Sequence, residues 1–204
     1  MRPVTHLIAA AAILLAGIAL AASGAGAASA GKVKTAVVSD HSGDAADNGI
    51  DLVRTTFGLT AGGQLRVSIT TADDFAPSDL RSRTGVPGSI CLELWTASVA
   101  GSNPPDYLVC VTANATGDAL RATIMKQRAG QLPQLVAPAT LTRSSEHNVT
   151  LRFGQSQIGR PAVIAFATEA TARGCEGHIS CVDSAPNAPR TATLKLRTPA
   201  TATG

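Results

Sequence analysis

Hydrophobic and polar positions alternate with a period of two residues along most of the chain after residue 30. Between residues 64 and 71, Leu65, Val67 and Ile69 are separated by polar residues. This period predicts a strand with one buried face. The same pattern recurs at Val53/Thr55/Phe57/Leu59, Leu120/Ala122/Ile124, Val149/Leu151/Phe153 and Ala192/Leu194/Leu196. We expect about ten strands between Thr35 and Arg197.

The segments between these patterns predict an all-β fold. Gly, Pro, Asn and Asp interrupt the chain at short intervals, and no segment has a convincing apolar stripe with a period of 3.6 residues. Many short strands pack either as two antiparallel sheets or as a partly closed barrel. We predict the first arrangement, a two-sheet antiparallel β-sandwich of jelly-roll or immunoglobulin-like topology, with one helical turn at residues 155–158.

The first 30 residues have the three-part layout of a secretory signal peptide. Arg2 provides positive charge, Leu7 to Leu20 form an apolar core, and Ala28-Ser29-Ala30 offers small residues for cleavage. An uncleaved membrane anchor is the alternative, but a spanning helix needs about 20 consecutive apolar residues and this core is shorter. We therefore expect a secreted, extracellular domain at residues 31–197, followed by a disordered tail at 198–204.

The charge pattern argues against several classes of partner. The whole chain has a formal net charge of +3, with both signs interspersed. Nucleic-acid-binding domains instead concentrate basic residues on one face. We expect no nucleic-acid partner, no membrane contact after signal cleavage, and a monomer.

All four cysteines lie beyond the predicted signal peptide, at Cys91, Cys110, Cys175 and Cys181. An even number of cysteines in an exported chain is typical of disulfides. A zinc site is the alternative, although neither spacing is that of a Cys-x2-Cys knuckle. We expect two disulfides, Cys91–Cys110 and Cys175–Cys181.

The first of these pairings follows from a predicted hairpin. Residues 89–96 and 106–112 are two strand segments separated by a loop at 97–105. When the loop closes symmetrically between them, Cys91 stands directly opposite Cys110. Side chains at such positions are close enough for a disulfide.

The same register predicts a candidate ligand-binding surface. It places Glu93, Trp95 and Asp106 on the outer face of the hairpin, whereas the apolar residues between them face the core. A Trp flanked by carboxylates is suited to stacking against a sugar ring or a cationic group. The alternative is that Trp95 packs over the disulfide or beneath a loop and is structural.

A second candidate site is an acidic stretch near the N-terminus of the domain. Residues 40–51 contain four carboxylates, at Asp40, Asp44, Asp47 and Asp51, and glycines where the chain can turn. Oxygen ligands on a bent loop are what Ca²⁺ requires, although the spacing is not that of an EF-hand. Asp and Asn also dominate ordinary turns. We expect no other cofactor, and the Ca²⁺ would only fix the loop.

The sequence contains few recognisable catalytic motifs. The sequence has no G-x-S-x-G nucleophile motif, and the predicted disulfides remove the cysteines as nucleophiles. A hydrolase using Glu93 and Asp106 remains open by residue type. We nevertheless predict that the protein is not an enzyme.

Several short motifs carry a resemblance to known proteins. The opening Asp40-His41-Ser42-Gly43-Asp44-Ala45, the pair Asp51-Leu52, the strand Pro105 to Val111 and the late segment Cys175 to Asp183 resemble secreted β-sandwich modules of unknown role from high-GC bacteria. The opening is also similar to those of DOMON-like and family 9 carbohydrate-binding sandwiches, which implies sugar or haem binding. The disulfide pattern resembles that of enediyne apoproteins, which implies a small hydrophobic ligand.

Together these features predict a secreted, non-catalytic binding or interaction module. Its ligand would be a carbohydrate, a cell-wall component or an extracellular protein. A small-molecule carrier is the main alternative, and a secreted hydrolase is a further one.

Overall fold

The computed structural model describes residues 34–45, 50–82, 85–97, 100, 103–174 and 181–196. The predicted signal peptide and the predicted C-terminal tail lie outside the described residues. No helix among the residues described is long and apolar enough to cross a membrane.

Within this part of the chain, eleven strands and two short 3-10 helices follow one another. In chain order they are β1 (Thr35–Ser39), β2 (Leu52–Leu59), β3 (Gln64–Thr71), η1 (Pro77–Leu80), β4 (Ser89–Trp95), β5 (Tyr107–Ala113), β6 (Leu120–Lys126), β7 (Gln134–Ser145), β8 (Asn148–Gly154), η2 (Gln155–Ile158), β9 (Val163–Thr171), β10 (Val182–Ala185) and β11 (Ala192–Lys195). The all-β class is therefore confirmed. The helical turn predicted at residues 155–158 is η2, whereas η1 was not predicted.

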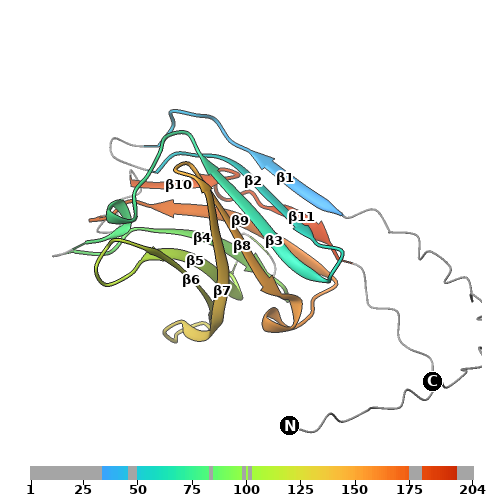
Figure 1. Cartoon of the computed structure of the whole chain (residues 1–204). Coiled ribbons are helices and arrows are strands. Elements are labelled where there is room, and N and C mark those ends of the chain that lie inside the picture. The colour runs from blue at the N-terminus through green and yellow to red at the C-terminus, as the bar shows by residue number, and fades with distance from the viewer. Residues whose placement is uncertain are drawn as a thin grey trace, which may run out of the picture. The chain divides into compact units, whose positions relative to one another are not determined.

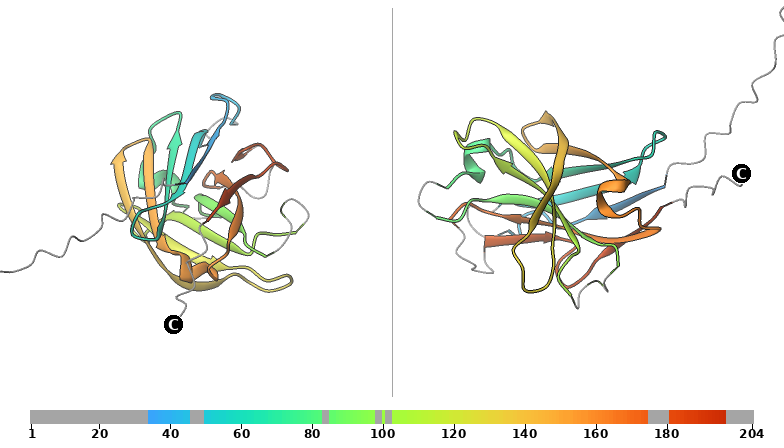
Figure 2. Two further views of the ribbon diagram at one scale, coloured as in Figure 1. Left: turned by 90° about the vertical axis from the view of Figure 1, so that its right-hand side faces the viewer. Right: turned by 90° about the horizontal axis from the view of Figure 1, so that it is seen from below.

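All strands belong to one antiparallel sheet, so the expected division into two sheets is not seen. The strand order is β1-β2-β3-β8-β7-β6-β5-β4-β9-β10, and β11 also pairs with β9. The sheet curls into a nearly closed, barrel-like shape (Figures 1 and 2). Its two ends approach each other, because β1 lies beside β11 and β2 beside β10.

The long strand β7 explains why the sheet is continuous. Its first half pairs with β6 and its second half with β8, and each pairing contains a bulge. Bulges bend a strand and increase its twist. β7 thus joins the strands on the β6 side of the sheet to those on the β8 side.

The core lies inside the curled sheet, where the inward positions of the strands meet. Phe57 packs edge-on against Phe166, with ring centroids 5.1 Å apart, and stacks against Phe153 at 6.5 Å. A buried polar contact also crosses the interior, because the hydroxyl groups of Thr55 and Thr168 are 2.8 Å apart. Apolar burial on this scale is the main stabilising contribution to the fold.

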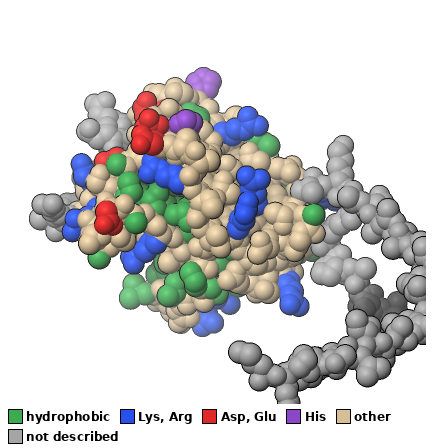
Figure 3. Space-filling model, in the orientation of Figure 1, with side chains coloured by type: hydrophobic (Ala, Val, Ile, Leu, Met, Phe, Trp, Pro, Cys, Tyr) green, Lys and Arg blue, Asp and Glu red, His purple; other side chains and the backbone are tan. Residues whose placement is uncertain are grey.

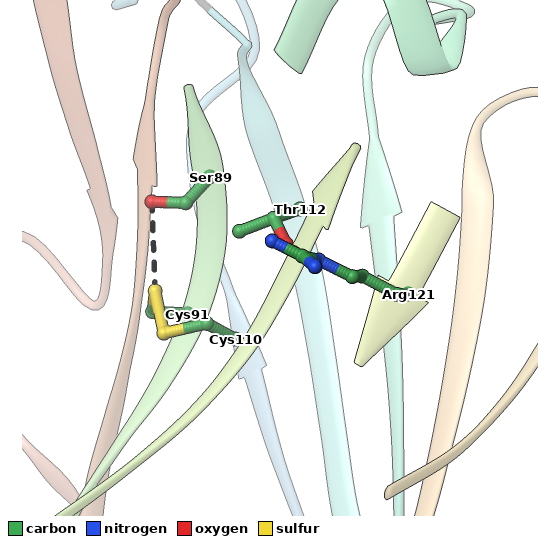
Figure 4. The surroundings of a disulfide bond; sticks show 5 residues. All are labelled: Ser89, Cys91, Cys110, Thr112 and Arg121. Carbon is green, nitrogen blue, oxygen red and sulfur yellow. Dashed lines mark hydrogen bonds between the residues drawn. A yellow bond between two sulfur atoms is a disulfide. The ribbon is translucent and has the colours of Figure 1, made fainter. Parts of the chain in front are cut away.

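The predicted β4–β5 register is confirmed. Cys91 lies opposite Cys110 and is joined to it by a disulfide on the outer face (Figure 4). On the inner face Ile90, Leu92 and Leu94 are completely buried. Cys181 is not a free thiol, and the second predicted disulfide falls outside the described residues because Cys175 does.

Candidate functional site

Carboxylates from three separate segments converge at one end of the barrel. Asp44 lies in the loop after β1, Asp51 directly precedes β2, and Asp183 lies on β10. One oxygen atom from each side chain lies within 4.8 Å of the others. Asp40, at the end of β1, is electrostatically coupled to Asp44 and Asp51. We call these four residues the carboxylate centre.

Backbone hydrogen bonds fix the geometry of this centre. The Gly43 amide donates to Asp51 Oδ2 at 2.6 Å, which folds the loop back toward β2. Gly43 has a φ of +90°, a conformation that residues with a Cβ rarely adopt. Asp183 accepts hydrogen bonds from the amides of Leu52, at 2.6 Å, and Ser184, at 2.7 Å.

The ionised forms of two carboxylates in the centre, Asp183 and Asp40, are destabilised by burial and by neighbouring negative charge. Asp183 is only 7% exposed. Burial raises its pKa, the backbone amides of Leu52 and Ser184 oppose this effect, and the charges of Asp44 and Asp40 raise it further. Burial is also the main reason that the pKa of Asp40 is raised. A bound cation would remove this repulsion, because it favours the ionised form of every carboxylate around it.

Two oxygen atoms of the centre are buried and accept no hydrogen bond from the residues described, Oδ2 of Asp40 and Oδ1 of Asp51. Buried polar atoms of this kind are uncommon and are often explained by an ion or a water. The donor set consists entirely of hard oxygens, which suits Ca²⁺. On the face shown in Figure 3, exposed acidic side chains lie toward the upper left, and basic side chains are spread over the rest.

The structure brings three residues of the acidic stretch near one another and adds a residue from a distant strand. Asp44 and Asp51 lie close together, Asp40 interacts electrostatically with both, and Asp47 lies outside the described residues. Their role as metal ligands stays a prediction. Asp183 was not predicted as a ligand, because it is more than 130 residues away in the chain. Asp183 is at an inward position of β10, but only the closure of the barrel brings this position beside β2.

A second feature is a pocket of about 320 Å³ on the outer face of β4, β9 and β10, which we call the outer pocket. It is lined by Glu93, Trp95, Asn103, Ala167, Glu169, Ser184, Pro186, Ala188, Pro189, Arg190 and Thr191. The pairing of β4, β9 and β10 places the two glutamates, Glu93 and Glu169, side by side on the floor of this pocket. Glu93 pairs with Ala167, and Glu169 lies between Cys91 on one side and Ser184 on the other.

Residues 186–191 form the wall of the outer pocket. The Ala188 amide donates to Ser184 Oγ at 3.1 Å, which holds the start of this segment against β10. The Asn187 side chain donates to Asp44 Oδ2 at 3.4 Å. The same short segment therefore contacts the carboxylate centre and shapes the outer pocket.

Trp95 lies on the predicted outer face but is covered. It is only 7% exposed, and its indole N–H donates to the Asn103 carbonyl at 2.8 Å. Trp95 therefore packs beneath the loop that joins β4 and β5 and has a structural role there. The ring contributes an edge of the outer pocket, and its face is not available as a wide stacking platform.

Asp106 also differs from its predicted surroundings. Its Oδ2 accepts hydrogen bonds from the amides of Thr96, at 2.7 Å, and Ala97, at 2.9 Å. These contacts hold the end of the β4–β5 loop. Asp106 does not line the outer pocket, whereas Glu169, which sequence reasoning missed, does.

The two glutamates of the outer pocket share an unusual electrostatic environment. Burial, with a further contribution from the charge of Glu169, raises the pKa of Glu93 to about 7. Burial also raises the pKa of Glu169, against a hydrogen bond from Thr171. Both carboxyl groups therefore keep a proton to higher pH than an exposed glutamate does, and perturbed carboxyl groups of this kind are common at functional sites.

Comparison with known proteins does not identify the chain. No family model matches it, and neither the curated proteins nor the solved structures contain a significant match. The resemblances drawn from its short motifs remain predictions.

Proposed function

We propose that this protein is a secreted, non-catalytic binding module whose ligand occupies the outer pocket. The observation that carries the proposal is the convergence of Glu93, Glu169 and the 186–191 segment around one concavity on a rigid sheet. Pockets that combine apolar walls with a few placed polar groups are typical of small-ligand sites. A carbohydrate, a cell-wall fragment or a side chain of a secreted protein fits a pocket of this size.

Ca²⁺ at the carboxylate centre would support this function without taking part in chemistry. Asp183 and Ser184 are neighbours on β10, one facing the centre and the other the pocket. An ion held by Asp44, Asp51 and Asp183 would fix β10 and the segment that follows it. Extracellular modules bind Ca²⁺ at millimolar to submillimolar concentrations, which suits a structural ion outside the cell.

Binding is tested with a panel of polysaccharides, cell-wall fragments and secreted proteins against the mature protein. Ala188→Trp should fill the pocket from its exposed rim and weaken binding at least about tenfold, because it removes the space for the ligand. Ala119→Trp, on the exposed β5–β6 turn, is the matched control and should bind as the wild type does. A bound ligand that is indifferent to Ala188→Trp would place the site elsewhere.

The paired glutamates favour a second candidate, a secreted hydrolase. Glycosidases use two carboxyl groups, one protonated as the acid and one ionised, and a raised pKa suits Glu93 to the acid role. The same panel separates the two functions. Release of new reducing ends that Glu93→Gln abolishes would establish the hydrolase, whereas binding without turnover supports the module.

A further inference from the structure

We propose that the outer pocket recognises a primary ammonium group carried on a compact body, such as a sugar ring or an alkyl chain. This inference rests on the proposed function, since it names the chemical class of ligand for the same pocket. It is carried by the arrangement of charged and apolar groups around the pocket.

Negative charge is concentrated on the floor of the pocket. Glu93 and Glu169 lie on adjacent strands and on the same face of the sheet, as diagonal neighbours. Among the residues described, the one ion pair is between His147 and Asp74, so neither glutamate has a cationic partner within 4 Å. Two carboxyl groups without a counter-ion form a favourable site for a positive charge.

The other charged groups near the pocket do not neutralise this pair. Arg190 comes from the wall segment and is exposed at the rim. No positive charge is among the causes that set the pKa of Glu93. Strand β10 contributes only the hydroxyl group of Ser184, and the Asp106 carboxylate on the β5 side is engaged by the β4–β5 loop. The carboxylates of Glu93 and Glu169 are therefore available to bind a positively charged ligand.

The walls determine what the ammonium group can be attached to. Pro186, Ala188 and Pro189 line one side, and Ala167 and the edge of Trp95 line the floor. These groups offer apolar contact and few hydrogen-bond donors. A hydrated metal ion would gain little from them, whereas an ammonium group on a ring or alkyl chain would use both the carboxylates and the apolar walls.

Ligand binding should be linked to proton release. Glu93 is about half protonated near pH 7, and a bound cation would favour its ionised form. The affinity for a permanently protonated amine should therefore rise about tenfold between pH 6 and pH 8, since the ionised fraction of Glu93 rises by that factor. A neutral ligand should not show this rise.

Calorimetric titration of the mature protein, with Ca²⁺ present, tests the inference. The probes are cadaverine, glucosamine and N-acetylglucosamine. Cadaverine remains protonated throughout the pH range, as a Lys side chain does. N-acetylglucosamine has the same ring as glucosamine but no charge on its nitrogen. At pH 7, where most of the glucosamine is still protonated, we expect one or both amines to bind and N-acetylglucosamine to bind at least about tenfold more weakly than glucosamine.

Three variants locate the binding. Glu93→Gln and Glu169→Gln should each weaken amine binding about tenfold or more, and Glu93→Gln should also remove the rise with pH. Glu146→Gln, an exposed carboxylate outside the pocket, is the matched control and should leave affinity unchanged. Circular dichroism and thermal unfolding of each variant separate lost binding from lost folding. The relative affinities of cadaverine and glucosamine distinguish alkyl amines and Lys side chains from amino sugars.

The possible results separate this inference from the function on which it rests. If neither amine binds at millimolar concentration, or if N-acetylglucosamine binds as well as glucosamine, the ammonium assignment is wrong. A pocket-dependent ligand from the wider panel would then leave the binding function in place. If Ala188→Trp affects no ligand of any class, the binding function at this pocket fails as well.

Discussion

Glu93 occupies an outward position of β4, yet its carboxyl group is largely removed from water. The neighbouring strand and the wall segment cover it, and Glu169 adds a like charge beside it. The sequence predicted the face on which Glu93 lies, because alternation and loop closure determined the β4–β5 register. Its burial depends on β9 and on residues 186–191, whose approach no local pattern reveals.

Glu93→Gln should stabilise the protein at alkaline pH. The folded-state pKa of Glu93, about 7, lies above the ordinary glutamate value of 4.5. The cost of ionising Glu93 in the folded state therefore appears as the pH rises from 4.5 through 7, and it is absent below that range. We expect the variant to gain about 1–2 kcal/mol in unfolding free energy at pH 8, a value discounted for partial exposure, and to match the wild type at pH 4.

Urea denaturation at both pH values measures this effect, with Glu146→Gln as the control. Equal stability of Glu93→Gln and wild type at pH 8 would show that the Glu93 carboxylate is well solvated. The claim that burial and the charge of Glu169 destabilise the ionised form of Glu93 would then be wrong.

At the scale of elements, β10 links the two candidate sites. Its inward residue Asp183 completes the carboxylate centre, and its outward residue Ser184 lines the pocket. The acidic stretch before β2 could be identified from sequence because its members are neighbours along the chain. Asp183 could not, because β10 reaches β2 only through closure of the barrel, and that long-range contact leaves no periodic signal.

Ca²⁺ should raise the unfolding temperature, and Asp183→Asn should largely remove the effect. At a concentration 100 times the Kd, a ligand specific for the folded state stabilises by about 2.7 kcal/mol, which corresponds to about 5–10 °C for a domain of this size. Differential scanning calorimetry with Ca²⁺ and with EDTA measures this shift. Glu146→Gln should retain it in full. If Ca²⁺ raises the unfolding temperature of Asp183→Asn as much as that of the wild type, Asp183 on β10 is not a ligand of the ion.

At the scale of the whole molecule, local patterns determined the strands but not their closure. The alternation in β2, β3, β6, β8 and β11 and the β4–β5 disulfide were predictable, since each depends on neighbouring residues. The choice between two sheets and one depends on β7, which pairs with a different partner in each half. No local pattern in the sequence marks this change of partner, so the barrel-like closure was not recognisable.

The most direct test of the proposed binding function is to map the ligand site on the protein by NMR. Amide chemical shifts of ¹⁵N-labelled protein would be followed during titration with the ligand that binds best in the panel. We expect the shifts to concentrate in the outward-facing residues of β4, β9 and β10 and in residues 186–191. Shifts confined to the opposite side of the barrel, on β3 and β8, would contradict it.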